Sequence, residues 1–201
     1  MTGTVLLVDD DPEIRELFSI YLGMRGYTAR EADGGSACLE EMQKHRPDII
    51  ILDMMMEPMD GWETLQAIRN KPAGQEIPVL IITGKPPTVE EILRYGGDIE
   101  DFIFKPVDFG TVIESLPRIL TSRRVLASEI NGVTSAGIDP ESAAEYAWLL
   151  RMDRIVHNLK NQLGAPEWTD PEPFKHNRVR LLQLHHDLGF PDHLLDPEER
   201  R

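Results

Sequence analysis

The stretch Ile49-Ile50-Ile51-Leu52-Asp53 decides the fold class. Four large aliphatic side chains in a row point alternately to the two faces of a β-strand, so both faces of this strand must be buried. Strands of this kind lie at the centre of parallel sheets that helices cover on each side. Because the run ends on an aspartate, the sequence predicts a carboxylate at the carboxyl end of a central strand.

Similar apolar runs lie on both sides of this strand in the chain and alternate with amphipathic segments. Strands are predicted at residues 4–8, 27–31, 48–52, 78–82 and 101–104. Helices are predicted at residues 12–24, 34–45, 61–69, 88–95 and 108–124. Pro117 is expected to kink or interrupt the last of these helices. Five βα units in succession predict an α/β fold with a doubly wound, five-stranded parallel sheet.

The last third of the chain has a purely helical pattern, which predicts a second, smaller domain. The stretch SEINGVTSAGID at 128–139 is short of large side chains and is predicted to be a linker. We therefore expect one domain at residues 1–126, a linker at 127–139 and a small all-α helical hairpin at 140–201.

The first helix of this hairpin is expected to begin at Pro140, with Asp139 as its N-cap, and to end at Gly164. Its apolar stripe is formed by Trp148, Met152, Ile155, Leu159 and Leu163. A proline-rich loop at 165–173 leads to a second helix at about 174–188, whose apolar face is expected to include Phe174, Val179 and Leu182. Two such helices cannot bury both stripes alone, so they are expected to pack on the first domain or on a second copy of themselves, and a homodimer through a four-helix arrangement is favoured.

Composition and charge exclude several classes of protein. The 201 residues include no apolar run long enough to cross a bilayer, and the N-terminus lacks the pattern of a signal peptide, so a cytoplasmic location is expected. Residues 1–120 carry a net charge of −11 and residues 121–201 one of −3, which disfavours nucleic-acid binding. The single cysteine, Cys38, allows no internal disulfide. His176, His185, His186 and His193 do not have the spacing in the sequence that is typical of zinc ligands.

Polar side chains follow four of the predicted strands at the point where each strand ends. Asp9 and Asp10 follow the first strand, Asp53 the third, Thr83 the fourth and Lys105 the fifth. These positions meet at one crevice in an open α/β sheet. Close carboxylates repel one another unless a cation lies among them, and oxygen ligands suit Mg²⁺. The pattern predicts a metal site at which an aspartate attacks phosphorus, while Thr83 and Lys105 neutralise the phosphoryl oxygens.

Four segments resemble those of a known family: VLLVDDDP at 5–12, IIILDMMMEPMDG at 49–61, LIITGK at 80–85 and FIFKP at 102–106. They are similar to the signature segments of the receiver domain of two-component response regulators, over about residues 3–124. The resemblance implies a CheY-like, flavodoxin-like sheet with strand order 2-1-3-4-5. It also implies a phosphoprotein that acts in phosphorelay signal transduction.

The resemblance assigns roles to individual residues. Asp53 is the implied phospho-acceptor, and Thr83 and Lys105 complete the catalytic site. The implied cofactor is Mg²⁺ or Mn²⁺, and its implied protein ligands are Asp9, Asp10, Asp53 and the backbone carbonyl of Met55. Phe102, three residues before Lys105, matches the aromatic switch residue that follows Thr83 toward the phosphate.

One part of the signature departs from the family pattern. The family usually has a proline four residues after the acceptor, whereas here Glu57 stands at that place and Pro58 follows it. Gly61 keeps its position. A reshaped loop is expected, with an effect on metal preference or on the lifetime of the acyl phosphate.

The predicted helix at the start of the second domain contains VHNLKNQL at 156–163, which is similar to the H-box of histidine-kinase dimerisation domains. The positions that match are His157, Leu159, Lys160, Asn161 and Leu163. A phosphotransfer role is implied for His157, with Lys160 and Asn161 beside it on the wet face of the helix. A solvated histidine on an ordinary helix is the simpler interpretation.

Three functions remain open at this stage. The leading one is a response regulator that accepts a phosphoryl group on Asp53 from a partner histidine kinase or phosphotransfer protein and switches contacts with a downstream protein. The second is a phosphorelay intermediate in which His157 exchanges phosphate with an aspartate. The third and least favoured is a DNA-binding transcriptional regulator. No ATP-binding kinase domain is predicted, so the expected catalysis is at most self-phosphorylation and dephosphorylation of a receiver.

Overall fold

The computed structural model describes residues 3–163 and 172–195. The chain divides into two compact units, one made of Met1–Pro86 and Glu100–Leu120, the other of Pro87–Ile99 and Thr121–Arg201. The second unit therefore takes a short segment from the middle of the chain as well as its C-terminal part. Within the described residues, no helix has the length and apolar character needed to span a membrane.

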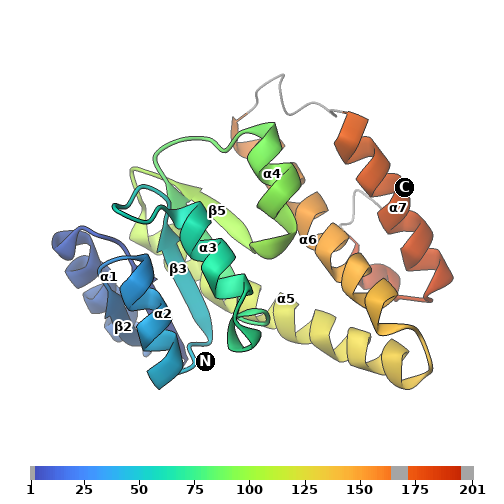
Figure 1. Ribbon diagram of the computed structural model, residues 1–201, viewed down its shortest axis with the longest axis horizontal. Helices are drawn as coiled ribbons and strands as arrows, with labels where there is room; N and C mark the ends of the chain where they lie inside the picture. Colours follow the sequence, from blue (N-terminus) through green and yellow to red (C-terminus); the bar gives the residue numbers. More distant parts are fainter. Residues whose placement is uncertain (1–2, 164–171, 196–201) are drawn as a thin grey trace. The chain divides into compact units, whose positions relative to one another are not determined.

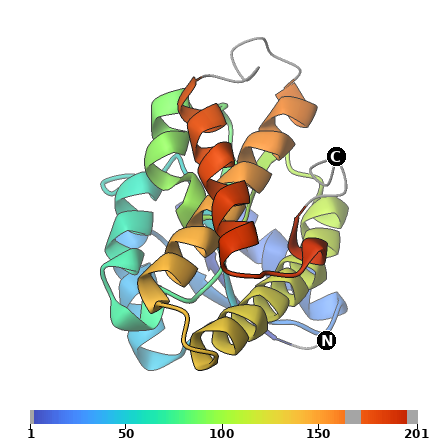
Figure 2. The same ribbon diagram turned by 90° about the vertical axis from the view of Figure 1, so that its right-hand side faces the viewer.

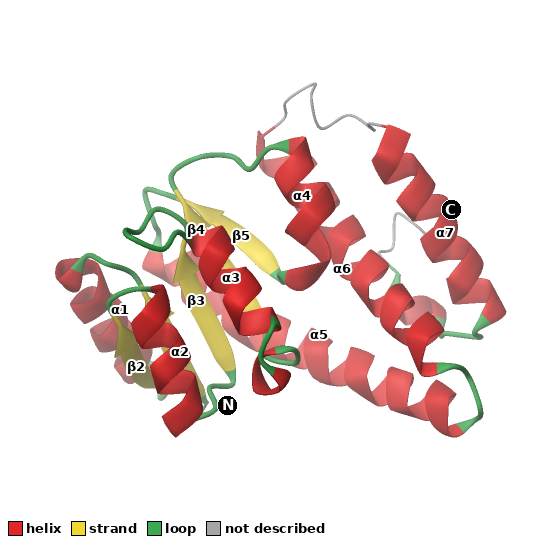
Figure 3. Ribbon diagram, in the orientation of Figure 1, coloured by secondary structure: helices red, strands yellow, loops and turns green. Residues whose placement is uncertain are grey.

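The first unit is built on a five-stranded sheet in which all neighbouring strands are parallel, in the order β2-β1-β3-β4-β5 (Figure 3). The strands are β1 (Thr4–Val8), β2 (Thr28–Ala32), β3 (Ile49–Asp53), β4 (Val79–Thr83) and β5 (Asp101–Phe104). This confirms the predicted fold class and strand order. All five residues of β3 and all five of β4 are buried, as expected for central strands with helices on both faces.

Helices cover both faces of this sheet (Figure 1). They are α1 (Pro12–Met24), α2 (Gly35–Lys44), α3 (Gly61–Arg69) and the first part of α5 (Phe109–Ser135), with a short 3₁₀ turn, η1, at Pro72–Gly74. α1 and α5 share one core with alternate strand residues such as Leu7, Ile51 and Ile82. The α1 helix begins as its sequence predicts, because the Asp11 side chain accepts a hydrogen bond from the backbone N–H of Glu13.

The α5 helix bears on two predictions made from the sequence. It continues through Pro117 without a break, because flanking residues including Leu116 and Ile119 are buried in the sheet core and hold both adjoining turns, and a kink at Pro117 stays a prediction. It also continues to Ser135, so most of the predicted 127–139 linker is helical. Leu126 is buried in the second core, and Ile130 and Val133 pack against that core. These three side chains form the apolar face of this part of α5, although most residues around them are small or polar.

The second unit is helical and contains α4 (Val89–Tyr95), the 3₁₀ turn η2 (Gly96–Asp98), α6 (Pro140–Leu163), α7 (Glu172–Asp187) and the 3₁₀ turn η4 (Asp192–Leu194). The α6 and α7 helices, orange and red in Figure 2, pack against each other. Asp139 caps α6 as predicted, because its carboxylate accepts hydrogen bonds from the N–H groups of Glu141 and Ser142.

Packing in the second unit differs from the sequence prediction on α7. Val179 and Leu182, which were expected in its apolar face, are exposed, and Leu181, Leu184 and His185 are buried in their place. Tyr146 on α6 sets the rotation of α7 about its own axis, because its hydroxyl and ring contact His185. The predicted stop at Gly164 and most of the predicted loop at 165–173 lie outside the described residues.

Candidate functional site

The register of the sheet brings the predicted site residues to one edge. Asp53 is the last residue of β3 and pairs with Ile82 of β4, while Thr83, the last residue of β4, pairs with Phe104 of β5. Asp9 and Lys105 directly follow β1 and β5. Because all strands are parallel, these four residues lie at the carboxyl edge of the sheet, where ligands bind in open α/β folds.

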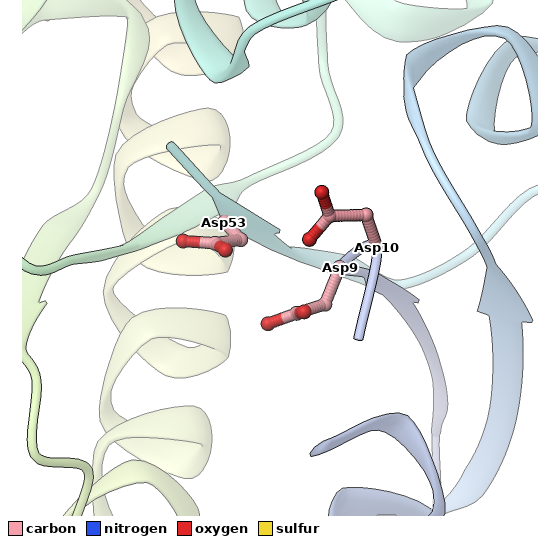
Figure 4. A group of neighbouring side chains, drawn as sticks. All are labelled: Asp9, Asp10 and Asp53. Atoms are coloured by element: carbon pink, nitrogen blue, oxygen red, sulfur yellow. The ribbon is translucent and has the colours of Figure 1, made fainter. Parts of the chain in front are cut away.

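Three carboxylates converge at this edge (Figure 4). Asp9, Asp10 and Asp53 each offer an oxygen atom, and these oxygens all lie within 4.8 Å of one another. The Asp9 and Asp53 side chains are buried, whereas Asp10 is exposed. Two carboxylates of the cluster are therefore buried in the protein and one lies at the surface. Water can reach the exposed side and complete the coordination sphere of a bound ion.

Lys105 is the positive group of the site. Its Nζ donates a hydrogen bond to Asp53 Oδ2 over 2.9 Å and lies 3.6 Å from Asp9 Oδ2. Partial burial acts to lower the pKa of Lys105, but the hydrogen bond and the charge of Asp53 outweigh it, and the pKa is raised. The lysine therefore stays an ammonium ion and neutralises part of the negative charge.

Asp9 is held from the protein side. Burial raises its pKa, and the neighbouring Asp53 carboxylate acts in the same direction, while the hydrogen bond from the Asp11 N–H, 2.9 Å from Oδ1, opposes the rise. The charged form of Asp9 is thus less stable in the site than in water. A cation bound among the three carboxylates would remove that deficit.

Arg15 on α1 fixes the backbone of Asp9, and sequence reasoning missed it. Its Nη1 donates to the Asp9 carbonyl oxygen over 2.7 Å, and its Nε lies 3.6 Å from Glu31 Oε2 on β2. The Ser19 hydroxyl donates to the other oxygen of Glu31. An arginine one turn after the Asp11 cap was the available signal, since a first-turn side chain can fold back over the preceding strand end.

The loop after Asp53 is shaped by a close backbone approach at Gly61. A Cβ there would lie 2.6 Å from Met54 Cα and 2.7 Å from the Asp53 carbonyl oxygen, so only glycine fits. Met55 donates its N–H to Asp53 Oδ1 over 3.3 Å. Glu57, the departure from the family pattern, is exposed, and the cluster of three carboxylates does not include it.

Thr83 ends β4 at the site, and Phe102 lies within β5, three residues before Lys105. The Thr83 hydroxyl donates to the Lys85 carbonyl over 2.9 Å and accepts from the Lys85 N–H over 3.1 Å. It is therefore engaged by the loop that follows β4. Phe102 is buried, and its ring makes an edge contact with Trp62 on α3, with 6.3 Å between centroids and 73° between planes.

The donor set fits a hard divalent cation. Three carboxylates within reach of one ion, one of them exposed, are the type of ligands that Mg²⁺ and Mn²⁺ prefer. Asp9, Asp10 and Asp53 could hold it. The carbonyl of Met55 stays a predicted ligand.

The predicted histidine site belongs to the second unit. His157 and Lys160 are half-buried on α6, and Asn161 is exposed. Of the other histidines, His185 binds Tyr146 and Asp192, while His186 and His193 lie near Asp187 and Glu129.

Comparisons with known proteins agree on the first unit. Residues 5–117 match the family described as the response regulator receiver domain. The chain is 34% identical over 184 residues to "Probable transcriptional regulatory protein TcrX" of Mycobacterium tuberculosis, covering 83% of this chain and 76% of that protein. It is 36% identical over 161 residues to "DNA-binding dual master transcriptional regulator RpaA" of Synechocystis, covering 76% and 65%.

The crystal structure of the chemotaxis protein CheY4 of Vibrio cholerae is similar in fold, with a TM-score of 0.55 and 30% identity over 59% of this chain and 99% of that one. The family match spans more than half of the chain and contains the strand ends that carry Asp9, Asp10, Asp53, Thr83 and Lys105. A parallel sheet in the order 2-1-3-4-5 supports the same assignment. The chain therefore belongs to the response regulator receiver domain family.

Proposed function

We propose that the chain is a phosphorylation-controlled switch that accepts a phosphoryl group on Asp53 in a reaction dependent on Mg²⁺ or Mn²⁺. The observation that carries this proposal is the position of Asp53. Its carboxylate is buried, lies within reach of Asp9 and Asp10, and accepts a hydrogen bond from Lys105. A carboxylate so placed is held in position beside an ammonium group and two further carboxylates.

The proposed reaction is an in-line displacement at phosphorus. An Asp53 oxygen forms a bond to phosphorus while the bond from phosphorus to the donor breaks, and the donor leaves as neutral imidazole from a phosphohistidine or as acetate from acetyl phosphate. A bound divalent cation would neutralise charge on the phosphoryl oxygens. Lys105, already 2.9 Å from Asp53, would contact the same oxygens.

Thr83 and Phe102 are the proposed switch. In the structure the Thr83 hydroxyl is paired with the Lys85 backbone. A phosphoryl group on Asp53 offers it charged oxygens, which accept stronger hydrogen bonds than a peptide carbonyl does. The movement of Thr83 would vacate space at the edge of the sheet and allow Phe102 to turn. Phosphorylation would thereby bias a two-state element.

The proposed partners are a histidine kinase or phosphotransfer protein that supplies the phosphoryl group, and a downstream protein that reads the switch. A cytoplasmic location and a homodimer are proposed with them. The exposed Val179 and Leu182 on α7 provide a small apolar surface for self-association.

A DNA-binding role is a second candidate output, because similar proteins are named as transcriptional regulators. The net charge of −3 on residues 121–201 opposes it, since phosphate contacts need basic side chains. A salt-dependent shift of random duplex DNA by the phosphorylated full chain would support this output, and its absence at low salt would exclude it.

The decisive experiment charges the full chain with acetyl phosphate and Mg²⁺ and tests the acid and base stability of the bound phosphate. Wild type is compared with Asp53→Asn and with Glu40→Gln, which removes one charge from an exposed position on α2. We expect base-labile phosphate in wild type and Glu40→Gln and none in Asp53→Asn. Base-labile phosphate that persists in Asp53→Asn would overturn the proposal.

The same experiment separates the switch from the phosphorelay alternative. His157→Gln is added, because its half-buried imidazole on α6 is the candidate carrier. Acid-labile, base-stable phosphate that disappears in His157→Gln would establish a relay. If the phosphate is entirely base-labile in wild type and in His157→Gln, the result assigns the second unit a role in protein contacts.

A further inference from the structure

The 3₁₀ turn η2 makes a close-fitting contact with α6. A Cβ at Gly97 would lie 2.3 Å from Nε1 and 2.4 Å from Cδ1 and Cδ2 of Trp148, so the indole occupies the space of any side chain at that position. Arg151 donates its Nε–H to the Gly97 carbonyl over 2.6 Å. Gly96 is next to Met152, whose Cγ lies 3.5 Å from the position of a Cβ. Glycine at 97 is required for this fit.

The three side chains that contact η2 lie on one face of α6. Trp148, Arg151 and Met152 are spaced by three and four residues, which places them together along the helix. Arg151 contacts the backbone of η2, while Trp148 and Met152 lie against its two glycines. We call the arrangement of Gly96, Gly97, Trp148, Arg151 and Met152 the η2 clamp.

The α4 helix depends on this clamp. It has seven residues, and Ile92 is the one buried side chain assigned to it. A helix this short is not stable by itself and takes its position from what it packs against. It packs with η2 and α6, and residues 87–99 group with the C-terminal helices accordingly. A displacement of α4 therefore displaces α6 as well, as long as the clamp holds.

The chain that enters α4 begins at the proposed switch. Thr83 binds both backbone groups of Lys85, and α4 has its N-cap at Thr88, five residues after Thr83. If Thr83 turns toward a phosphoryl group, the Lys85 N–H and carbonyl both lose their partner. The two hydrogen bonds that tie this segment to the end of β4 are then lost, and the chain from Gly84 to Pro87 is released to take another path into α4.

We propose that the η2 clamp makes α4 the coupling element between Asp53 and the C-terminal helices, with α6 of the same chain occupying the surface of η2. This inference rests on the proposed function, because the input is phosphorylation of Asp53. Its new content is the route: the signal passes within one chain, through Gly97, Trp148 and Arg151. The η2 surface is then not available to a partner protein while the clamp is closed.

The test is amide hydrogen exchange of the full chain, with and without acetyl phosphate and Mg²⁺. Three chains are compared: wild type, Gly97→Ala, whose new methyl group meets the Trp148 indole, and Gly132→Ala. Gly132 lies in α5 with nothing within 4 Å of its would-be Cβ, so the same chemical change leaves the clamp intact. Arg151→Met, which removes the hydrogen bond and keeps an apolar stem, is the milder variant should Gly97→Ala not fold.

In wild type and Gly132→Ala, we expect phosphorylation to change exchange in the 84–99 segment and in α6 together, by about threefold or more. In Gly97→Ala or Arg151→Met, the change should remain in the segment before α4 and be lost from α6. The occupancy of Asp53 is measured on the same samples as base-labile phosphate.

The outcomes separate the two proposals. A chain that takes no phosphoryl group on Asp53 refutes the proposed function and this inference with it. Phosphorylated wild type whose α6 does not respond, or a clamp variant whose α6 responds as fully as wild type, refutes the inference and leaves the proposed function standing.

Discussion

The hydroxyl of Tyr146 on α6 lies 2.8 Å from Nδ1 of His185 on α7, and both side chains are buried. Phe190 stacks on the tyrosine ring, with 4.0 Å between centroids. The hydrogen bond therefore lies inside an apolar core, where a lost partner cannot be replaced easily by water.

Tyr146→Phe should lower the free energy of unfolding by about 1–3 kcal/mol, because it leaves a buried imidazole nitrogen without its partner. Urea unfolding followed by circular dichroism measures the effect. Tyr21→Phe is the control, since Tyr21 is exposed and loses the same oxygen. Equal stability of the Tyr146 variant and wild type would contradict the assigned role of this pair.

Mg²⁺ should raise the melting temperature of the full chain, because the carboxylate cluster that would bind it exists only in the folded state. At about 100 times the Kd the gain is about 2.7 kcal/mol, a shift of several degrees. The shift should shrink strongly in Asp10→Asn and persist in Glu40→Gln. A melting temperature that millimolar Mg²⁺ leaves unchanged would rule out the site.

Arg15→Met should weaken Mg²⁺ binding by about tenfold, since the Asp9 backbone loses the hydrogen bond that fixes it. Titration calorimetry with Mg²⁺ measures the change directly. Arg25→Met removes an exposed arginine after the end of the same helix and should bind as wild type does. If both variants bind alike, Arg15 does not position the site.

Lys105→Met should have opposite effects on metal binding and on phosphorylation. Removing an ammonium ion 2.9 Å from Asp53 deletes a repulsive charge, so Mg²⁺ affinity should rise by about threefold to tenfold. Phosphorylation by acetyl phosphate should slow, because the phosphoryl oxygens lose their cation. Weaker Mg²⁺ binding in this variant would show that Lys105 mainly orders the carboxylates.

The Cys38 thiol should not react in the native protein. Burial raises its pKa to about 12, so at pH 8 only about one molecule in ten thousand carries the thiolate. A thiol reagent at pH 8 should label the unfolded chain fully and the folded chain at the rate of unfolding. Rapid native labelling would mean that α2 opens locally.

The sequence was sufficient to predict the sheet, because runs such as Val79–Thr83 are apolar on both faces and fit few other structures. It placed the carboxylates together because parallel strands end at the same edge. The packing of α7 was not predictable in the same way. Leu181 and Leu182 are adjacent, and which of them is buried depends on a partner, Tyr146, that is distant in the chain.

The η2 clamp was also not visible in the sequence. Gly96-Gly97 indicates a turn, but nothing local shows that an indole from position 148 fills the space above it. Residues 128–135 have the sequence of a linker because large side chains are few among them. Leu126, Ile130 and Val133 supply a helical stripe there only when a second core is present to receive it.

The chain enters the second unit at residues 87–99, returns to the first unit and then completes the second. This order limits where a gene for this protein can be divided. Residues 87–99 are translated in the middle of the receiver but pack with helices that are translated later. A protein fragment ending near residue 120 would contain every strand of the sheet, yet Gly97 and its neighbours would lack their contacts with Trp148 and Arg151. Such a truncated receiver would display a surface that Trp148 and Arg151 cover in the full chain, so binding partners selected with it would include artefacts.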